Sequence, residues 1–348
     1  RDATYDISLA TFEKQFSVVN EMTQPYGIAF NNDGSKMFVV NNTGRRIYSY
    51  ALSVNFDIGS ALALSLADSF YMGTTVTPTG IAFNNDGTKM YIVEAFYDDI
   101  YEYDLSTAFS VSTAVFLQSF SIAAQEIYPR SLKFNTDGTK MFVSGVNGGD
   151  VNEYALSTGF DVSSASFVDS FSVAASPQGL AFNADGTKMF VTGGAGDYVN
   201  EYTLSTGFDV SSASYVQNFS IAAQDTQPSD MIFNNDGTKM FVIGLLGDAV
   251  YQYDIPENYY ANQMDKTQLD AVTDPNHIAL SNDLDLAMVF NMTNGTTVPS
   301  SNGIAIDYDA NVLNKGAILG TDYDFDAPAQ DEVRITSLIN ANLKVRVV

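Results

Sequence analysis

The sequence of 348 residues predicts an all-β protein: a five-bladed β-propeller closed by its own N-terminal strand, followed by a small C-terminal module resembling a β-sandwich or jelly roll. Three observations predict this fold. An Asn-x-Asp-Gly motif occurs five times, and successive copies of its glycine lie 48 to 53 residues apart. A proline stands nine positions before each of these glycines. Each repeat holds four short apolar runs, and four antiparallel strands recurring at about 50 residues are typical of propeller blades.

The second repeat illustrates the four predicted strands. The first is the apolar run Gly80–Phe83, and an Asp-Gly pair follows it, which predicts a type I′ hairpin turn. The second strand is Lys89–Val93, whose leading lysine we interpret as a solvated strand residue. The third is Ile100–Tyr103, in which tyrosine alternates with other residues, and the fourth surrounds Phe120. The repeated motif is therefore interpreted as part of the scaffold.

The two ends of the repeat region predict how the ring closes. Phe12–Val18 resembles a fourth strand that lacks its first three, whereas the last repeat stops after its third strand at Tyr253. The N-terminal strand can therefore complete the fifth blade. We predict a propeller over residues 1–255, a connector over 256–265 and the C-terminal module over 266–348.

The C-terminal module is predicted from apolar segments that turn residues separate. HIAL, LAMVF, GIAIDY, VRITSL and LKVRVV read as strands. Asp322, Asp324 and Asp326 alternate along TDYDFDAPA, so on a straight strand they would lie about 6.8 Å apart on one face. A solvated acidic strand or turn is one interpretation. A Ca²⁺ site is the other, and it requires a bend that would bring the three carboxylates together.

The charge and the residue content exclude several classes of function. There are 41 acidic and 16 basic residues, a net charge of −25, so binding to nucleic acid or to an anionic membrane is not expected. There is no cysteine, which removes disulfides and thiolate chemistry. No apolar run reaches about 18 residues, so we expect no membrane insertion.

Catalytic motifs are missing as well. His277 is the single histidine, and Glu102, Glu153 and Glu201 occupy equivalent strand positions in three repeats, which marks them as repeat residues rather than an acid–base pair. We therefore predict that the protein is not an enzyme.

Candidate ligand-binding residues are those that vary inside the repeated frame. The residues that directly follow the frame prolines are Tyr26, Thr79, Arg130, Gln178 and Ser229. Five different side chains near the channel mouth fit either a tailored pocket or drift in an exposed loop. The loops after the second strands of the first two repeats add charge and aromatic rings, which suit carbohydrate stacking or protein contact. Their candidate residues are Arg45, Arg46, Glu94, Phe96 and Tyr97.

The frame P-x-G-I-A-F-N-x-D-G-T-K-M-F-V and the connection L-S-T-G-F-D-V-S-S-A resemble propeller repeats of marine bacteriophage and bacterial surface proteins. The segments ALSNDLDLAMVF and GAILGTDYDFDAPAQDEVRITSL resemble a module of phage virion proteins, particularly tail-fibre-like ones. The resemblance implies a structural or adhesive virion protein, exposed outside the cell. It also implies contacts with other virion subunits through the C-terminal module, and a homo-oligomer.

We accordingly expect a non-enzymatic virion protein whose propeller recognises a host surface glycan or protein. One alternative is a bacterial surface adhesion module. The other is a carbohydrate-active lyase or glycosidase, for which Glu94, Glu126 and Arg130 are the candidate catalytic residues.

Overall fold

The computed structural model describes residues 5–62, 68–74, 76–173, 176–193 and 197–255, together with the backbone of four short strands between residues 287 and 346. The chain divides into two units, Arg1–Glu257 and Asn258–Val348. No helix in the described part of the chain is long and apolar enough to cross a membrane.

The predicted five-bladed propeller is confirmed, because the described strands of the first unit form five four-stranded antiparallel sheets. Blade 1 contains β2 (Pro25–Phe30), β3 (Lys36–Asn41), β4 (Arg46–Ala51) and β5 (Ser69–Tyr71). Blade 2 contains β6 (Pro78–Phe83), β7 (Lys89–Glu94), β8 (Asp99–Leu105) and β9 (Ala114–Ser121). Blade 3 contains β10 (Pro129–Phe134), β11 (Lys140–Gly145), β12 (Asp150–Leu156) and β13 (Ala165–Ser172). Blade 4 contains β14 (Pro177–Phe182), β15 (Lys188–Gly193), β16 (Tyr198–Leu204) and β17 (Ala213–Ser220).

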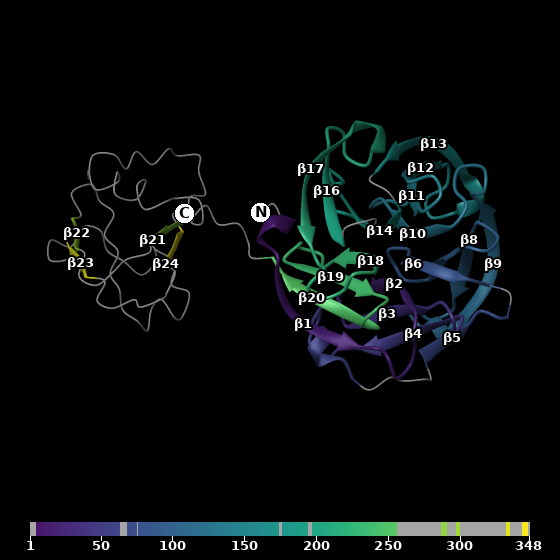
Figure 1. Ribbon diagram of the computed structural model, residues 1–348, viewed down its shortest axis with the longest axis horizontal. Coiled ribbons are helices and arrows are strands. Elements are labelled where there is room, and N and C mark those ends of the chain that lie inside the picture. Colours follow the sequence, from purple (N-terminus) through teal and green to yellow (C-terminus); the bar gives the residue numbers. More distant parts are fainter. Residues whose placement is uncertain are drawn as a thin grey trace. The chain divides into compact units, whose positions relative to one another are not determined.

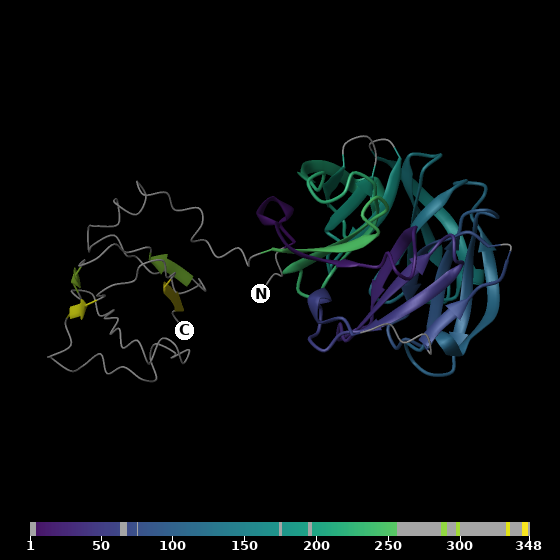
Figure 2. The same cartoon turned by 60° about the horizontal axis from the view of Figure 1, so that its bottom comes forward.

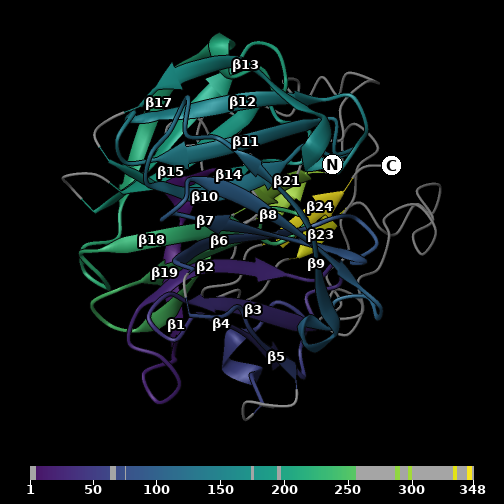
Figure 3. The ribbon, with the colours of Figure 1, turned by 90° about the vertical axis from the view of Figure 1, so that its right-hand side faces the viewer.

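Blade 5 is closed by the N-terminal strand, as predicted. Its order is β1 (Thr11–Ser17), β20 (Ala249–Asp254), β19 (Lys239–Gly244) and β18 (Pro228–Phe233). Figure 2 shows β1 running beside β20. The first strand of each blade lies nearest the middle of the ring in Figure 1, and Figure 3 shows β13, β12, β11 and β10 following one another inward.

Short 3₁₀ helices precede the outermost strands. They are η1 (Ile7–Leu9), η2 (Ile58–Ser60), η4 (Val111–Thr113), η5 (Val162–Ser164) and η6 (Val210–Ser212). An aspartate caps four of them: the side chains of Asp6, Asp57, Asp161 and Asp209 each accept a backbone N–H two residues ahead.

Three aromatic rings pack together at each interface between blades. Between blades 1 and 2, Phe83 of the inner strand packs on Phe38 of the preceding blade and on Phe109 of its own connection, with ring centroids 4.6 and 5.3 Å apart. In blade 5 the connection is the N-terminal segment, and Tyr5 takes the place of that phenylalanine, 5.0 Å from Phe233. The repeated phenylalanines are therefore the contacts that join neighbouring blades.

The Asp-Gly turns differ from the predicted type I′ geometry. Of the pair Asp33 and Gly34 only the glycine has a positive φ, of 71°, and its N–H donates to the carbonyl of Asn31. Asp33 instead uses its carboxylate to accept the N–H of Ser35 at 2.9 Å. The glycine is also needed for space, because a Cβ there would lie 2.2 Å from the ring of Phe56.

The repeated lysines are likewise not simply solvated. Lys140 pairs with the buried Glu153 at 2.7 Å, and Lys188 pairs with the buried Glu201 at 2.9 Å. The second oxygen of Glu153 accepts the N–H of Val210 at 3.0 Å and so holds the connection of the next blade. These glutamates thus have a structural role.

Four strands of the second unit are described as backbone. β21 (Ala287–Phe290) pairs with β24 (Leu343–Arg346), and β22 (Thr297–Pro299) pairs with β23 (Glu332–Arg334), both antiparallel. The predicted connector and most of the predicted module lie outside the described residues, so the module's fold stays a prediction.

Candidate functional site

The inner strands touch one another at the level of their glycines. A Cβ on Gly27 would lie 2.7 Å from the carbonyl oxygen of Thr79, and one on Gly179 would lie 2.6 Å from the Cα of Asp230. Backbone therefore meets backbone around the ring axis at this level, and glycine allows this close approach in blades 1, 2 and 4. Blades 3 and 5 depart from the frame, with Ser131 and Asp230 at the equivalent positions.

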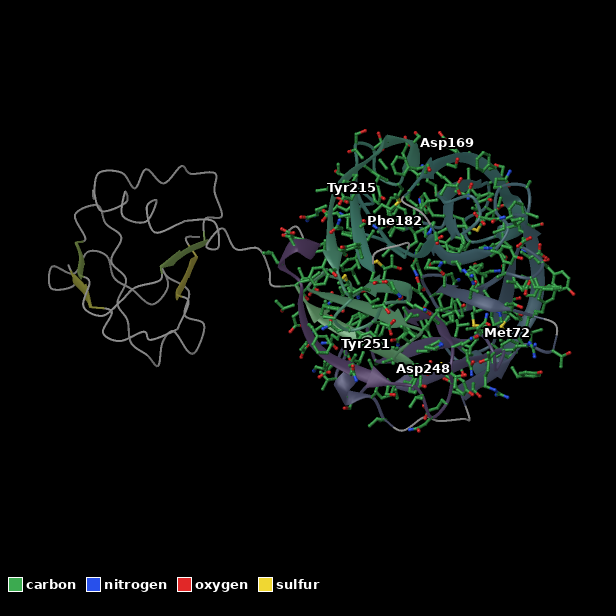
Figure 4. The ribbon with its side chains drawn as sticks, viewed as in Figure 1. Met72, Asp169, Phe182, Tyr215, Asp248 and Tyr251 are labelled. Carbon is green, nitrogen blue, oxygen red and sulfur yellow. The ribbon has the colours of Figure 1, made fainter. Side chains whose placement is uncertain are left out.

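A cavity of about 370 Å³ lies next to this closed level, toward the face that carries the five Asp-Gly turns. We call it the axial cavity and that face the turn face. Residues from all five inner strands line it at one level: Ala29, Ala82, Lys133, Ala181 and Ile232. Aromatic rings form part of its wall, among them Phe182, which Figure 4 shows inward of Asp169 at the ring's margin.

Lys133 is the one cationic side chain among the described residues that line the cavity. Its ammonium lies 3.7 Å from the carboxylate of Asp230, whose side chain is 1% exposed. Asp230 stands at the position of the frame glycines, next to the level that lines the cavity. Asp230 also accepts the hydroxyl of Ser131 at 2.8 Å and the N–H of Ile28 at 3.2 Å. Burial raises the pKa of Asp230, and the nearby Lys133 charge opposes that rise.

A chain of side-chain amides forms the rim of the axial cavity. The amide nitrogens of Asn235, Asn32 and Asn85 each donate to the backbone carbonyl of the corresponding residue in the next blade. Thr136 continues the chain by donating to the carbonyl of Ala184 at 3.3 Å. Ala184 has no donor side chain, and the carbonyl of Asn235 instead accepts the Tyr5 hydroxyl at 3.3 Å. The rim thus joins neighbouring blades in four of five places.

The predicted binding residues that follow the frame prolines lie at the opposite ends of the inner strands, on the face we call the loop face. The Arg130 guanidinium lies over the ring of Tyr26, 5.2 Å from its centroid, although the two come from blades 3 and 1. Thr79 and Ser229 are buried, and each hydroxyl donates to a proline carbonyl of the neighbouring blade. Gln178 is half-buried, and its side chain donates to the carbonyl of Ser176. Thr79 and Ser229 therefore join blades by hydrogen bonds, and Arg130 and Tyr26 contact each other across blades.

The predicted loop residues also lie on the loop face. Arg45 donates to the carbonyl of Val76 at 3.1 Å, and Arg46 donates to Ser69 at 2.9 Å and stacks on Tyr71. Both contacts lie within blade 1 or its connection. A role for these two arginines in binding a ligand stays a prediction.

Glu94 is fully buried, unlike Phe96 and Tyr97 of the same loop. Its carboxylate accepts the backbone N–H groups of Thr77, Phe96 and Tyr97, so it holds the loop that presents the two aromatic rings. Phe96 and Tyr97 are 66% and 50% exposed and pack edge to face, with centroids 4.8 Å apart. Their predicted contact with a glycan stays a prediction.

Glu126, the other candidate catalytic carboxylate, holds a loop in the same way. It accepts the N–H groups of Asn147 and Gly148 at 3.0 and 2.9 Å, and burial raises its pKa. Neither it nor Glu94 lines the axial cavity, and no aspartate or glutamate is among the described lining residues. A two-carboxylate hydrolysis therefore has no pair of groups there.

The predicted calcium ligands Asp322, Asp324 and Asp326 lie outside the described residues. Among the residues that are described, no group of three or more histidine, aspartate or glutamate side chains is arranged to hold a metal ion.

Sequence reasoning missed Lys133 and Asp230. The signal was present in the frame, where the second to fourth residues after the proline read Gly-Ile-Ala, Gly-Ile-Ala, Ser-Leu-Lys, Gly-Leu-Ala and Asp-Met-Ile along the five repeats. The predicted binding residues of the frame come only from the position directly after the proline. The residues that line the axial cavity were therefore not among the predicted binding residues.

Known structures are similar to this chain at low sequence identity, while no family model and no curated protein matches the chain. A protein of unknown function from Desulfotomaculum acetoxidans is 14% identical over 66% of this chain and 68% of its own, with a TM-score of 0.43. A candidate 6-phosphogluconolactonase from Bacteroides fragilis is 14% identical over 65% of each chain, with a TM-score of 0.43. The periplasmic gluconolactonase of Pseudomonas aeruginosa is 15% identical over 66% of each chain, with a TM-score of 0.41. This chain spans about two thirds of the length of these proteins.

These structures correct one prediction. The missing catalytic motifs indicated that the protein is not an enzyme, and that prediction is wrong, because the similar structures include proteins named as gluconolactonases. The likeness itself extends to the fold alone and does not bring lactone hydrolysis to this chain.

Proposed function

We propose that the propeller is a ligand-recognition domain that binds a small, sugar-sized molecule in its axial cavity. One observation carries the proposal: all five inner strands leave a cavity of about 370 Å³ at the ring axis. Small-molecule sites in proteins commonly measure about 300 to 1,000 Å³. Side chains from every blade surround the cavity, so a closed ring holds its shape before a ligand arrives.

The chemistry of the wall suits a molecule with both apolar and hydroxyl-bearing faces. Phenylalanine rings and alanine methyl groups line the cavity, and its rim carries asparagine amides. The amide nitrogens of Asn32, Asn85 and Asn235 are used within the rim, whereas no hydrogen bond to their amide oxygens occurs within the described residues. These oxygens are acceptors for ligand hydroxyl groups, while aromatic rings suit the C–H faces of a sugar.

We propose a surface-exposed setting for this domain: a phage virion, with a bacterial cell surface as the alternative. The support is the resemblance of the repeat frame to such proteins and the net charge of −25, which favours solubility outside the cell. In the virion setting the C-terminal module binds neighbouring subunits of a homo-oligomer, and the propeller meets a glycan or protein of the host. Phe96 and Tyr97 on the loop face are the residues we propose for a contact with a larger host partner.

Ligand-observed NMR with D-glucose, N-acetylglucosamine and D-glucuronate tests the cavity. We expect saturation transfer from the wild-type protein to at least one of these sugars. The matched control fills the cavity by Ala82→Ile together with Ala181→Ile, since blade 5 carries Ile232 at the equivalent position. The filled variant should remain folded and lose the transfer. Transfer of equal size to the filled variant would place binding elsewhere, and no transfer to any sugar in the wild-type protein would refute the proposal.

Immuno-electron microscopy with an antibody against the propeller tests the setting. Label on the tails or fibres of phage particles supports the virion setting. Label confined to host cells would refute the virion setting and support the alternative, a bacterial surface protein.

A further inference from the structure

Two of the five inner strands break the repeat frame inside the channel, and they do so with opposite charges. Blade 3 has Lys133 where three blades have alanine, and blade 5 has Asp230 where three blades have glycine. We propose that Lys133 is the anion-binding residue of the axial cavity and that its ligand carries a carboxylate group. This inference rests on the proposed function, because it names the class of ligand for the same cavity.

The ammonium of Lys133 has unused hydrogen-bonding capacity. Its side chain is only 14% exposed, yet it makes no hydrogen bond within the described residues, and its one charged neighbour there is Asp230 at 3.7 Å. That separation is longer than a direct N–H···O hydrogen bond, so all three N–H donors remain for another acceptor. A nearly buried ammonium needs such acceptors, and the cavity that it lines is the space where a ligand oxygen can supply them.

Asp230 acts as a positioning residue. Its two oxygens are held by the Ser131 hydroxyl and the Ile28 N–H, so the carboxylate is fixed one level away from the cavity. It attracts the ammonium toward the ring axis without contacting the cavity itself. The ammonium is therefore kept at the base of the cavity instead of extending toward solvent.

The surroundings favour a singly charged anion. The rest of the described lining is uncharged at neutral pH, consisting of alanine, isoleucine, phenylalanine, asparagine, threonine and one tyrosine. The described lining supplies a single cation, so a phosphate ester would bring about two negative charges next to Asp230 and onto a protein of net charge −25. A ring of sugar size with one carboxylate fits the volume, the aromatic wall and the single cation together.

Isothermal titration calorimetry at pH 7 with D-glucose, D-glucuronate and glucose 6-phosphate tests the inference. Glucose and glucuronate share a ring and differ in the carboxylate. We expect glucuronate to bind the wild-type protein at least about tenfold more tightly than glucose, which is about 1.4 kcal/mol. Lys133→Ala, which restores the residue of the other blades, should reduce this preference to about onefold. Lys14→Ala, which removes a lysine from the outer strand β1 away from the cavity, should leave the preference unchanged.

Asp230→Asn separates positioning from a purely structural role. Without the Asp230 charge the ammonium is no longer held at the base of the cavity, so the preference for glucuronate over glucose should decrease, whereas a purely structural role would lower both affinities equally. Equal affinities for glucose and glucuronate would overturn the inference while leaving the proposed function intact. Tighter binding of glucose 6-phosphate than of glucuronate, or a preference that survives Lys133→Ala, would also overturn it. If no probe binds, the proposed function and the inference both fail.

Discussion

The buried pair of Lys133 and Asp230 makes a prediction about stability that needs no ligand. Lys133→Met keeps most of the side-chain length and removes the charge. At the 3.7 Å separation, two unit charges attract by about 4 kcal/mol at an effective dielectric constant of about 20. Removing one partner of a buried ion pair costs about 3–5 kcal/mol. We therefore expect the substitution to lower the free energy of unfolding by about 3 kcal/mol at pH 8.

The loss should depend on pH in a definite direction. Burial raises the pKa of Asp230 above its unfolded value, so the folded state binds more protons and stability falls as pH rises through the folded pKa. Lys133 opposes that rise, and without it the folded pKa moves further upward. The variant should thus lie closer to the wild-type protein at low pH, where protonation removes the Asp230 charge, and fall behind as pH increases.

Urea unfolding followed by tyrosine fluorescence between pH 4 and pH 8 measures both effects. The matched control is the double variant Lys133→Ala with Asp230→Gly, which restores the frame of the other blades. Replacing a buried ion pair by uncharged residues is often close to neutral, so the double variant should recover most of the lost stability and show a weaker pH dependence. A single variant that loses the same stability at pH 4 as at pH 8 would refute the electrostatic argument.

Three further predictions concern the contacts that close and join the blades. Tyr5→Phe should lower the free energy of unfolding by about 1 kcal/mol, because it removes the hydrogen bond from the hydroxyl to the Asn235 carbonyl. Tyr5→Ala should lower it by about 3–5 kcal/mol, because it also removes the ring that packs on Phe190 and Phe233. Urea unfolding of both variants measures these losses, and equal losses would contradict the reasoning. Ala184→Asn should supply the missing rim donor and raise Tm by about 2–4 °C in a thermal melt, while Ala184→Asp, which lacks the donor, should not. Glu153→Gln should lower the free energy of unfolding by about 2 kcal/mol, because its ion pair with Lys140 is lost. The difference between the variant and the wild-type protein should persist in 1 M salt. A difference that disappears in salt would mean that solvent screens the pair.

The loop face shows how far sequence reasoning reached and where it stopped. Variation after the frame prolines was visible in the sequence, and the structure places these residues together at one end of the inner strands. The sequence does not show, however, which of these side chains already use their polar groups in hydrogen bonds within the protein. The hydroxyl groups of Thr79 and Ser229 donate to carbonyl groups of neighbouring blades, and the carboxylate of Glu94 accepts backbone N–H groups around its own loop. Those hydrogen bonds join residues whose separation in space depends on the packing of whole blades.

The sequence by itself determined the repeat, the number of blades and the closure of the ring by the N-terminal strand. It could do so because strand period, turn residues and the complementary ends are local properties of the chain. Only the tertiary structure decided that Lys133 and Asp230, 97 positions apart, form one ion pair beside the axial cavity. Their approach results from ring closure, which brings the inner strands of blades 3 and 5 to a common axis, and no local pattern encodes the distance across that axis.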